Sequence, residues 1–329
     1  MNHAPGHSPG QTELPRSDQG MKCSRCRRPA RHRLPSHNAR FCDHCLGVFF
    51  RRQVEKAIKQ FEMLEFGQRV LVAVSGGKDS LALWQVLREL GYPAEGVHIS
   101  LELGDGVFGQ ASLASCQEMA RRLDAPLHLF NMAQMAGHGV QEIAWANKRS
   151  FCSVCGALKR YYLNKICLDL GCEVIATGHH LDDEAARLLG NLVRRHRQYL
   201  ESQWPALPGA PGAFAKKIKP LCRLRGAEIK SYAKAQDLPV AQGTCPRSKG
   251  ATLPYYTEAV RLLEERMPGT SLNFYLGYLE DKAGPPAAPD GYRRCPSCGM
   301  PTFAETCTVC RFLARTAERE EKKARAAQE

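Results

Sequence analysis

Residues 69–91, which read RVLVAVSGGKDSLALWQVLRELG, decide the fold of this chain. The segment begins with a short apolar, β-branched run that is typical of a buried strand, and it ends with apolar residues at helical spacing up to Gly91. A glycine-rich loop lies between them. Backbone N–H groups at such a junction, together with the dipole of the following helix, predict a site for phosphate groups.

The loop has the composition that a phosphate site needs. Its glycines let the backbone approach a pyrophosphate, its lysine supplies fixed positive charge, and its hydroxyls supply hydrogen-bond donors. The spacing matches neither the Walker pattern nor GxGxxG, which argues against a Walker-type site and against a nicotinamide site. The residues of the loop are Ser75, Gly76, Gly77, Lys78, Asp79 and Ser80.

Strand-like and helix-like segments alternate along the rest of the chain. Strands are predicted at 95–103, 126–132 and 172–180, and helices at 111–125, 157–171 and 181–193. This alternation predicts an α/β fold with a doubly wound, mostly parallel sheet. Pro, Gly and charged residues predict a long loop at 194–219, and two closing helices are predicted at 225–236 and 255–267.

The composition limits the class of protein. The 329 residues are 43% hydrophobic and carry a formal charge of +13. No stretch reaches the length of about 18 uncharged apolar residues that a membrane helix needs, and residues 1–20 lack a secretion signal and predict a disordered arm. We therefore expect a soluble, cytoplasmic protein with no membrane partner. The charge favours nucleic acid as a partner, although many soluble proteins are basic without a specific reason.

Most of the 15 cysteines occur as close CxxC pairs, which suit thiolates that chelate metal in a reducing compartment better than they suit disulfides. Two sets of four have the spacing of a tetrahedral, structural Zn²⁺ site, in which the metal folds a small module and does not catalyse. The predicted ligands are Cys23, Cys26, Cys42 and Cys45 in one module and Cys295, Cys298, Cys307 and Cys310 in the other.

Three further motifs follow the SGGKDS loop in order: FCSVCGALKRY at 151–161, ATGHHLDDEA at 176–185 and TCP at 244–246. Together these motifs resemble the TtcA/TtuA family of tRNA 2-thiolation enzymes, in the PP-loop ATP pyrophosphatase superfamily. The two flanking zinc modules resemble its TtuA-like thiouridylase branch. The resemblance covers roughly residues 21–312 and implies a PP-loop, HUP-like fold flanked by two small zinc-binding modules.

The resemblance implies an ATP-dependent sulfurtransferase that adenylates the C2 oxygen of a uridine and replaces it with sulfur. The implied cofactors are ATP, Mg²⁺ and a four-iron, four-sulfur (4Fe-4S) cluster, besides two Zn²⁺. The implied partners are tRNA, held by the basic zinc modules, and a ubiquitin-like sulfur carrier with a C-terminal thiocarboxylate; a homodimer is also expected. Alternatives are 2-thiocytidine synthesis, a lysidine-type synthetase, or a non-catalytic zinc-ribbon RNA-binding protein.

The same resemblance makes Cys152, Cys155 and Cys245 the cluster ligands, which leaves one iron open to a sulfur species. The residues alone leave other interpretations open, because the Cys152–Cys155 pair also suits a redox dithiol and Cys222 is a rival third ligand. The remaining cysteines fall within or beside apolar patterns and are expected in the core. They are Cys116, Cys167 and Cys172.

By resemblance, Asp183 is the catalytic carboxylate, Lys159 lies between cluster and nucleotide, and Asp79 serves Mg²⁺ or pyrophosphate. Asp182 is expected to cap the helix that it opens. His180 stands where the family usually has asparagine, and no catalytic role is assigned to it. The expected ATP-binding set is Ala73, Ser75, Gly76, Gly77, Lys78, Asp79, Ser80, Ile99, Lys159, Gly178 and Asp183.

The sequence thus divides into a catalytic domain with appendages. The predicted parts are a disordered arm at 1–20, an N-terminal zinc module at 21–48, a linker helix at 49–66, a PP-loop ATP-binding domain at 67–282, a linker at 283–291, a C-terminal zinc ribbon at 292–312 and a charged tail at 313–329.

Overall fold

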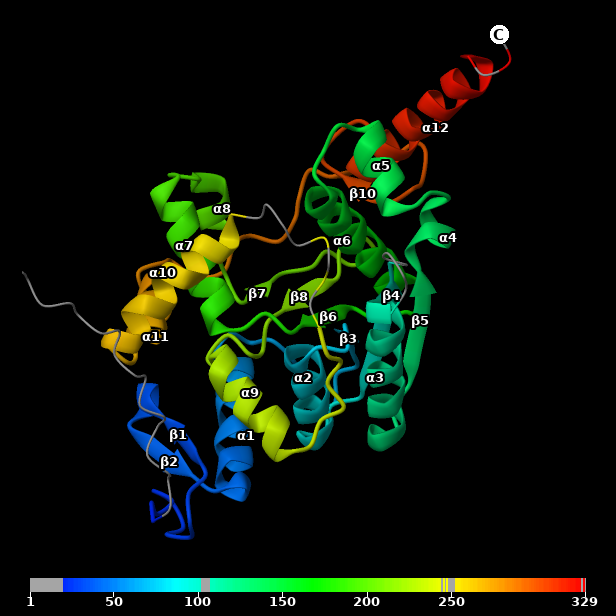
Figure 1. Ribbon diagram of the computed structural model, residues 1–329. Coiled ribbons are helices and arrows are strands. Elements are labelled where there is room, and N and C mark those ends of the chain that lie inside the picture. The colour runs from blue at the N-terminus through cyan, green and yellow to red at the C-terminus, as the bar shows by residue number, and fades with distance from the viewer. Residues whose placement is uncertain are drawn as a thin grey trace, which may run out of the picture.

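The computed structural model describes residues 20–101, 107–243, 245, 247, 252–326 and 328. Its centre is a six-stranded sheet in the order β5-β4-β3-β6-β8-β7 (Figure 1). The strands are β3 Val70–Ala73, β4 Ala94–Ser100, β5 Leu127–Asn131, β6 Val174–Thr177, β7 Ala206–Leu207 and β8 Lys216–Ile218. Neighbouring strands are parallel except β7 with β8. The predicted α/β fold with a mostly parallel sheet is confirmed.

Helices cover both faces of the sheet, which explains why its central strands β3 and β6 are almost entirely apolar. Val70 and Val72 of β3 pack into one core, whereas Leu71 between them packs into a second core on the opposite face. The first core includes α1 Asp43–Gln60, α2 Lys78–Glu89, α3 Val107–Leu123, α7 Leu181–Val193 and α9 Gly226–Ala235. The second includes α4 Met132–Ala136, α5 Val140–Ala146 and α6 Phe151–Asp169.

The strand order places the ligand-binding edge of the sheet. From β3 the chain passes outward through β4 and β5, and it then returns to β6 on the other side of β3. The strand order therefore reverses between β3 and β6, and such a switch point is where open α/β sheets bind ligands. Both the SGGKDS loop and the GHHLDD segment begin at this edge.

The prediction of one long loop at 194–219 is wrong. This segment holds a short helix, α8 Arg197–Glu201, and the strands β7 and β8 that extend the sheet. A β-turn region joins the two strands, and a Cβ on Gly209 would lie 2.5 Å from the carbonyl oxygen of Phe214. Strands of two and three residues are too short to show a period-two pattern, and the Pro and Gly residues around them hid the hairpin.

The two cysteine modules lie at opposite ends of the molecule (Figure 1). The N-terminal one contains β1 His32–Leu34, the short 3-10 helix η1 Pro35–His37, β2 Ala39–Phe41 and the start of α1; the C-terminal one contains β9 Arg293–Arg294, β10 Pro301–Thr302 and the start of α12 Thr308–Ala326. The predicted arm lies outside the described residues apart from Gly20. The helix expected in the charged tail is continuous with the second module, and Phe312 and Thr316 are buried beside α5.

Two more helices, α10 Leu253–Arg266 and α11 Thr270–Glu280, pack against α7. Within the described ranges, every helix is too short or too polar to cross a membrane.

Candidate active site

The loop after β3 is folded tightly at the start of α2. Ser75 donates its backbone N–H to Ser80 Oγ at 3.1 Å, and Ser80 Oγ donates to the carbonyl oxygen of Gly77 at 3.1 Å. Gly76 has a φ of +74°, and a Cβ at this position would lie 2.6 Å from the carbonyl oxygen of Ser112. Glycine is therefore required there by both backbone conformation and space. This arrangement leaves the first N–H groups of α2 for an anion.

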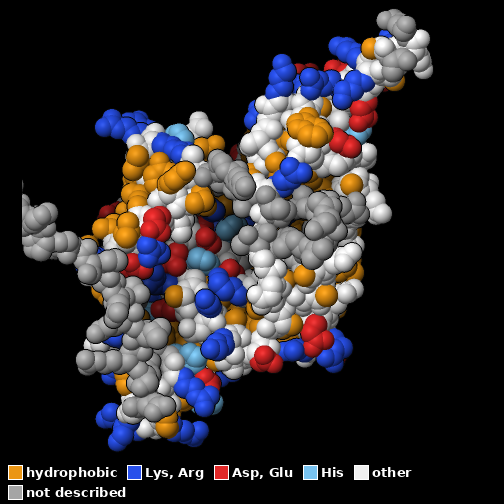
Figure 2. All heavy atoms as spheres, viewed as in Figure 1, with side chains coloured by type: hydrophobic (Ala, Val, Ile, Leu, Met, Phe, Trp, Pro, Cys, Tyr) orange, Lys and Arg blue, Asp and Glu red, His pale blue; other side chains and the backbone are white. Residues whose placement is uncertain are grey.

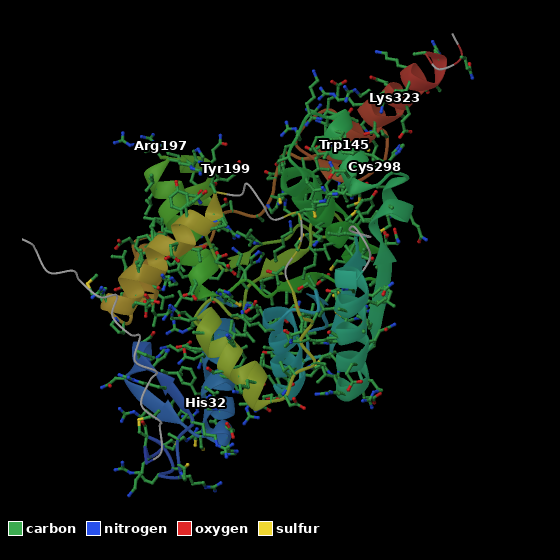
Figure 3. The ribbon with its side chains drawn as sticks, in the orientation of Figure 1. His32, Trp145, Arg197, Tyr199, Cys298 and Lys323 are labelled. Atoms are coloured by element: carbon green, nitrogen blue, oxygen red, sulfur yellow. The ribbon has the colours of Figure 1, made fainter. Side chains whose placement is uncertain are left out.

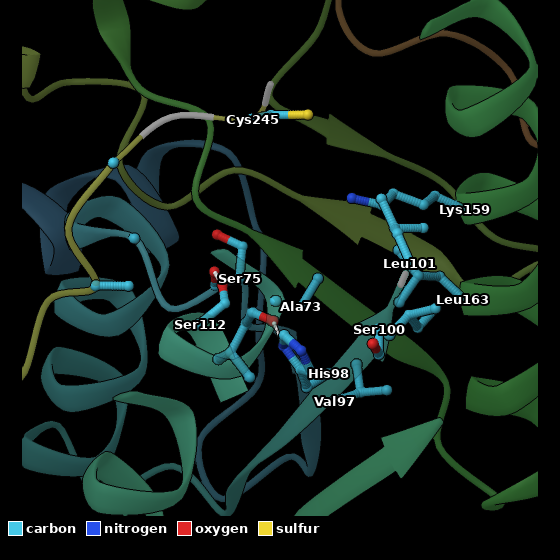
Figure 4. A pocket seen from close by; sticks show the side chains of 16 residues that line it. Ala73, Ser75, Val97, His98, Ser100, Leu101, Ser112, Lys159, Leu163 and Cys245 are labelled. Atoms are coloured by element: carbon cyan, nitrogen blue, oxygen red, sulfur yellow. Dashed lines mark hydrogen bonds between the residues drawn. The ribbon is translucent and has the colours of Figure 1, made fainter. Parts of the chain in front are cut away.

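A cavity of about 350 Å³ opens beside this loop (Figure 4). Its walls come from the SGGKDS loop, β4, α3, α6 and the segment that follows α9. Lys159 and Cys245 extend into the cavity from opposite sides in Figure 4. The expected ATP-binding residues in its walls are Ala73, Ser75, Gly77, Ile99 and Lys159. Ala241 donates its N–H to the carbonyl oxygen of Gly76 at 3.0 Å, which fixes this crossing segment over the loop.

The other expected nucleotide residues lie next to the cavity. Lys78 Nζ contacts Asp79 Oδ1 at 2.5 Å, and both side chains are about 30% exposed. Gly178 comes directly after β6. It lies so close to α2 that an added Cβ would be 2.9 Å from the backbone nitrogen of Ser80. The loops after β3 and β6 are thus in direct contact, which brings Asp79 and Asp183 to one site.

Asp183, and not Asp182, caps α7. The Oδ2 atom of Asp183 accepts a hydrogen bond from the backbone N–H of His180 at 3.2 Å. His180 Nε2 lies 3.6 Å from the same oxygen and 3.9 Å from Asp79 Oδ1, so the imidazole sits between the expected catalytic carboxylate, Asp183, and Asp79, which is expected to serve Mg²⁺ or pyrophosphate. Its Nδ1 atom is buried and has no hydrogen-bond partner among the described residues.

Asp182 has a different structural role from the predicted cap. It accepts hydrogen bonds from Arg225 Nε and from the backbone N–H of Gly226, each at 3.0 Å. Arg225 also contacts the buried Glu264 at 3.4 Å, and Glu264 accepts a hydrogen bond from Ser36 Oγ at 2.7 Å. A chain of charged contacts therefore connects the start of α7 to α9, α10 and the N-terminal module.

A second buried network supports α7 from behind. Glu184 is fully buried and binds Lys219 at 2.7 Å and Arg187 at 2.8 Å. Burial alone would raise the pKa of Glu184, but the two positive charges overcome this effect and lower it. Burial, together with the charges of Arg187 and Lys219, lowers the pKa of the neighbouring His179 to about 4. His179 is therefore neutral near pH 7, and it contacts Thr177 Oγ1 at 2.9 Å.

Of the three expected cluster cysteines, Cys245 lines the cavity, whereas Cys152 and Cys155 lie outside its lining, on α6. Ser150 caps α6 by accepting from Ser153 N–H, so the helix begins at Phe151 and carries Cys152 and Cys155 in its first turns. Cys152 Sγ donates to the carbonyl oxygen of Arg247 at 3.3 Å, which places it beside the segment that holds Cys245. Burial raises the pKa of Cys155 and the positive charge of Lys159 opposes this, while the charges of Cys245 and Cys152 add to it.

This triad is more open than a site for a single ion. Its sulfur atoms do not form a group whose members all lie within 4.8 Å of one another, whereas the sulfur atoms of each terminal set do. Thiolates that bind different irons of one cluster are separated by the cluster itself, so the wider spacing fits a 4Fe-4S group. The cationic side chains of Lys159 and Arg160 also suit its negative charge.

Cys222, the rival third ligand, is fully buried in the first core. Burial raises the pKa of its thiol to about 12, so it is a poor source of thiolate. The cysteines expected in the core are all buried: Cys116, Cys167 and Cys172.

Each terminal set has four sulfur atoms close enough to bind one metal ion. Cys26 Sγ and Cys42 Sγ lie 3.6 Å apart in the first set, and Cys298 Sγ and Cys307 Sγ lie 3.8 Å apart in the second. Burial opposes ionisation of Cys23, but backbone N–H donors offset it and lower its pKa to about 6. Four thiolates at this spacing suit tetrahedral Zn²⁺.

Sequence reasoning missed two residues that shape the cavity. His98 on β4 is buried, and its Nδ1 lies 3.0 Å from the carbonyl oxygen of Val74; burial lowers its pKa. Ser112 on α3 donates its hydroxyl to the carbonyl oxygen of Ser75. A histidine inside the apolar run VHIS was a usable signal for the first residue, because a buried polar group needs a partner. Ser112 lies in an ordinary amphipathic helix, and the sequence contains no signal that marks it.

Comparison with known proteins shows the family. Residues 49–243 match the PP-loop domain family. The tRNA-5-methyluridine(54) 2-sulfurtransferase of Thermotoga maritima is 39% identical over 303 residues, which are 92% of this chain and 99% of that relative. The chain belongs to the PP-loop tRNA 2-thiolation family. A second member, the enzyme of the same name from Thermus thermophilus, is 41% identical over 297 residues, which are 89% of this chain and 91% of that one.

The fold of this PP-loop tRNA 2-thiolation protein has a solved counterpart. The U34-tRNA thiolase NcsA from Methanococcus maripaludis, with its 4Fe-4S cluster, superimposes with a TM-score of 0.74 at 25% identity and covers 89% of this chain and 95% of that one. The resemblance drawn from the SGGKDS, FCSVCGALKRY and GHHLDDEA motifs is therefore confirmed, as is the flanked α/β fold.

Proposed function

We propose that the chain catalyses ATP-dependent synthesis of 2-thiouridine in tRNA. The uridine O2 attacks the α-phosphorus of ATP and pyrophosphate leaves, which makes O2 part of a good leaving group. A sulfur nucleophile then attacks C2, the C2–O2 bond breaks and AMP departs. The observation that carries this proposal is that residues of the SGGKDS loop, Lys159 and Cys245 line the same cavity.

The residues around the loop have defined tasks in this proposal. Backbone N–H groups at the start of α2 and the Lys78 ammonium bind the departing pyrophosphate. The walls formed by Ala73, His98 and Ile99 accommodate the nucleoside. Asp79 and Asp183 are partly exposed carboxylates in the first turns of α2 and α7, and hard oxygen ligands of this kind suit Mg²⁺.

Cys152, Cys155 and Cys245 would hold the 4Fe-4S cluster, which when bound supplies an open iron position for a sulfur species. Lys159 lies one helical turn after Cys155 and faces the cavity, so its charge stabilises phosphate on one side and anionic sulfur on the other. The solved NcsA, which carries such a cluster, supports this assignment.

We further propose uridine 54 as the substrate. The relatives named for 5-methyluridine 54 are 39% and 41% identical to this chain, whereas the U34 thiolase NcsA is 25% identical. The zinc modules are proposed to bind tRNA phosphates through exposed arginines such as Arg27 and Arg28. A ubiquitin-like sulfur carrier, a homodimer and a cytoplasmic location are further proposals from the family resemblance.

An anaerobic assay tests the proposed reaction. The purified chain, reconstituted with iron and sulfide, is incubated with ATP, sulfide and unthiolated tRNA, and the nucleosides are measured by mass spectrometry. We expect 2-thiolated uridine and one AMP per product, and nuclease mapping should place the sulfur at position 54. Asp183→Asn should lower the rate by about a hundredfold or more. Asp169→Asn, at an exposed position on α6, should leave it unchanged.

Formation of 2-thiocytidine or lysidine, or thiolation without AMP, would contradict the proposed chemistry. Sulfur at position 34 would leave the chemistry intact and overturn the proposed position.

A further inference from the structure

The turn between α7 and α8 is a basic and aromatic surface that the proposed site does not use. Residues 192–199 are exposed without interruption, and they include Arg194, Arg195, His196, Arg197 and Tyr199. Tyr199 is 62% exposed, and its ring makes an edge contact with His196 at 5.5 Å between centroids. Helices α7, α8 and α10 form one lobe of the molecule, and Figure 3 shows Arg197 and Tyr199 at its outer tip.

The arginines of this turn are not neutralised. Within the part of the chain that the structure describes, Arg194, Arg195 and Arg197 have no acidic partner. Exposed arginines on other helices differ: Arg121 and Arg122 both bind Glu118. Arginines held together without counterions attract a polyanion strongly, because each phosphate that binds releases condensed cations.

The turn is also held in place. Arg194 lies over the ring of Tyr256 at 5.3 Å, and that ring packs where a Cβ on Gly190 would be 3.1 Å away. Arg195 has a φ of +54°, a left-handed conformation that ends α7 and turns the chain into α8. The basic groups are therefore presented by an ordered turn.

The α7–α8 turn and the proposed active site lie at opposite ends of the same helix, α7. α7 has Asp183 in its first turn, so Arg194 lies roughly 16 Å along the helix axis from the proposed catalytic carboxylate. Figure 2 shows that the surface is hollowed between the lobe that carries α7 and α8 and the lobe of α5 and α12, and Figure 3 shows Arg197 at the outer end of the first lobe, on the side away from that hollow. A tRNA whose target base enters the site extends well beyond this distance.

We propose that the α7–α8 turn binds the substrate tRNA beside the target nucleotide, with Arg195 and Arg197 on phosphates and Tyr199 stacked on a base. This inference rests on the proposed function, because it takes tRNA as the substrate. Arginine with an exposed aromatic ring is the combination that single-stranded loops of RNA bind, since unstacked bases offer their faces to the ring.

The test measures binding of unthiolated tRNA over a series of salt concentrations. Arg195→Gln with Arg197→Gln removes two charges and keeps most of the side-chain stems. We expect on the order of tenfold weaker binding at physiological salt, and a salt dependence shallower by about 1.4 to 1.8 in logarithmic slope. Arg121→Gln with Arg122→Gln makes the same charge change on α3 and should behave as wild type.

Substitutions of Tyr199 separate the contribution of base stacking to tRNA binding from the contribution of charge. Tyr199→Ala should weaken tRNA binding without changing the salt slope, and Tyr199→Phe should restore wild-type affinity because it keeps the ring. ATP binding and iron content should stay at wild-type values in all of these variants.

The outcomes separate this inference from the proposed function. If wild type neither binds nor thiolates tRNA, the proposed function fails. If wild type does both and the Arg195/Arg197 variant binds tRNA like the α3 control, only the α7–α8 inference fails. Unchanged tRNA affinity with slower turnover on a protein sulfur donor would also overturn it, and would assign the turn to that donor.

Discussion

At the scale of single residues, the site depends on places where two backbones meet without room for a side chain. Gly76 and Gly178 are two positions of this kind. Each lies where the SGGKDS segment and the backbone of a neighbouring segment come into close contact. The glycine of SGGKDS could be predicted from the motif, because a phosphate loop needs close backbone approach. The need for glycine at 178 depends on the distance between β6 and α2, which no local pattern contains.

Gly178→Ala should therefore damage the site. The added Cβ would lie 2.9 Å from the backbone nitrogen of Ser80, so the two loops must separate. We expect a loss of about 1 to 3 kcal/mol in the free energy of unfolding, as for other overpacked positions, together with weaker ATP binding. Urea unfolding and a nucleotide-binding titration measure the two effects.

Gly277→Ala is the matched control, since Gly277 lies within α11 and nothing is within 4 Å of its added Cβ. It should stabilise the protein by about 0.5 to 1 kcal/mol. Wild-type ATP binding by Gly178→Ala would show that the contact between the loops does not shape the site.

His179 should make the free energy of unfolding depend on pH. Its pKa is about 4 in the folded chain and about 6.5 when unfolded, so the unfolded state binds the extra proton. The stability contribution is complete above pH 6.5 and falls as the pH drops toward 4, with a loss of about 2 kcal/mol between pH 7 and pH 5. His179→Gln should show a flatter pH dependence by that amount in urea unfolding.

His196→Gln, on the exposed α7–α8 turn, should keep the wild-type pH dependence. An unchanged slope in His179→Gln would mean that His179 is not the titrating group.

At the scale of elements, the two ends of α7 belong to two different surfaces, the proposed active site and the basic turn. Its first turn carries Asp183 and the Asp182 anchor, and its last turn leads into the basic turn. The helix itself could be predicted from its apolar period. Which of its two adjacent aspartates caps it could not, because the choice depends on Arg225 and Gly226, which are distant in sequence and reach Asp182 only in the folded chain.

Glu264 should be the critical member of the network that anchors α7. It is buried on α10 and accepts hydrogen bonds from the backbone N–H groups of Gly269 and Ser271, each at 2.7 Å. Glu264→Gln removes the charge that balances Arg225 and turns an N–H₂ group toward donors, so we expect a loss of about 2 kcal/mol or more in unfolding free energy.

Glu265→Gln is the neighbouring control, because Glu265 is 54% exposed and pairs with Arg261 at the surface. It should change the unfolding free energy by less than about 0.5 kcal/mol. Equal effects at 264 and 265 would show that the buried contacts of Glu264 do not stabilise the fold.

At the scale of the whole molecule, the cysteines have three separate environments. The terminal sets could be predicted from spacing alone, because each pair of CxxC motifs is local. The Cys152, Cys155 and Cys245 set could not, since Cys245 reaches the α6 cysteines only through the segment that crosses the PP-loop. Resemblance to a family supplied that assignment, and the residues alone left Cys222 as a rival third ligand until its burial was known.

The central claim is that one cavity serves both a nucleotide and a cysteine-bound cluster. The most direct test is iron and acid-labile sulfide analysis of anaerobically reconstituted wild type, Cys245→Ala and Cys222→Ala. We expect about four irons per chain in wild type, a loss of the cluster in Cys245→Ala and full retention in Cys222→Ala. A cluster that persists without Cys245, or that disappears with Cys222, would contradict the account.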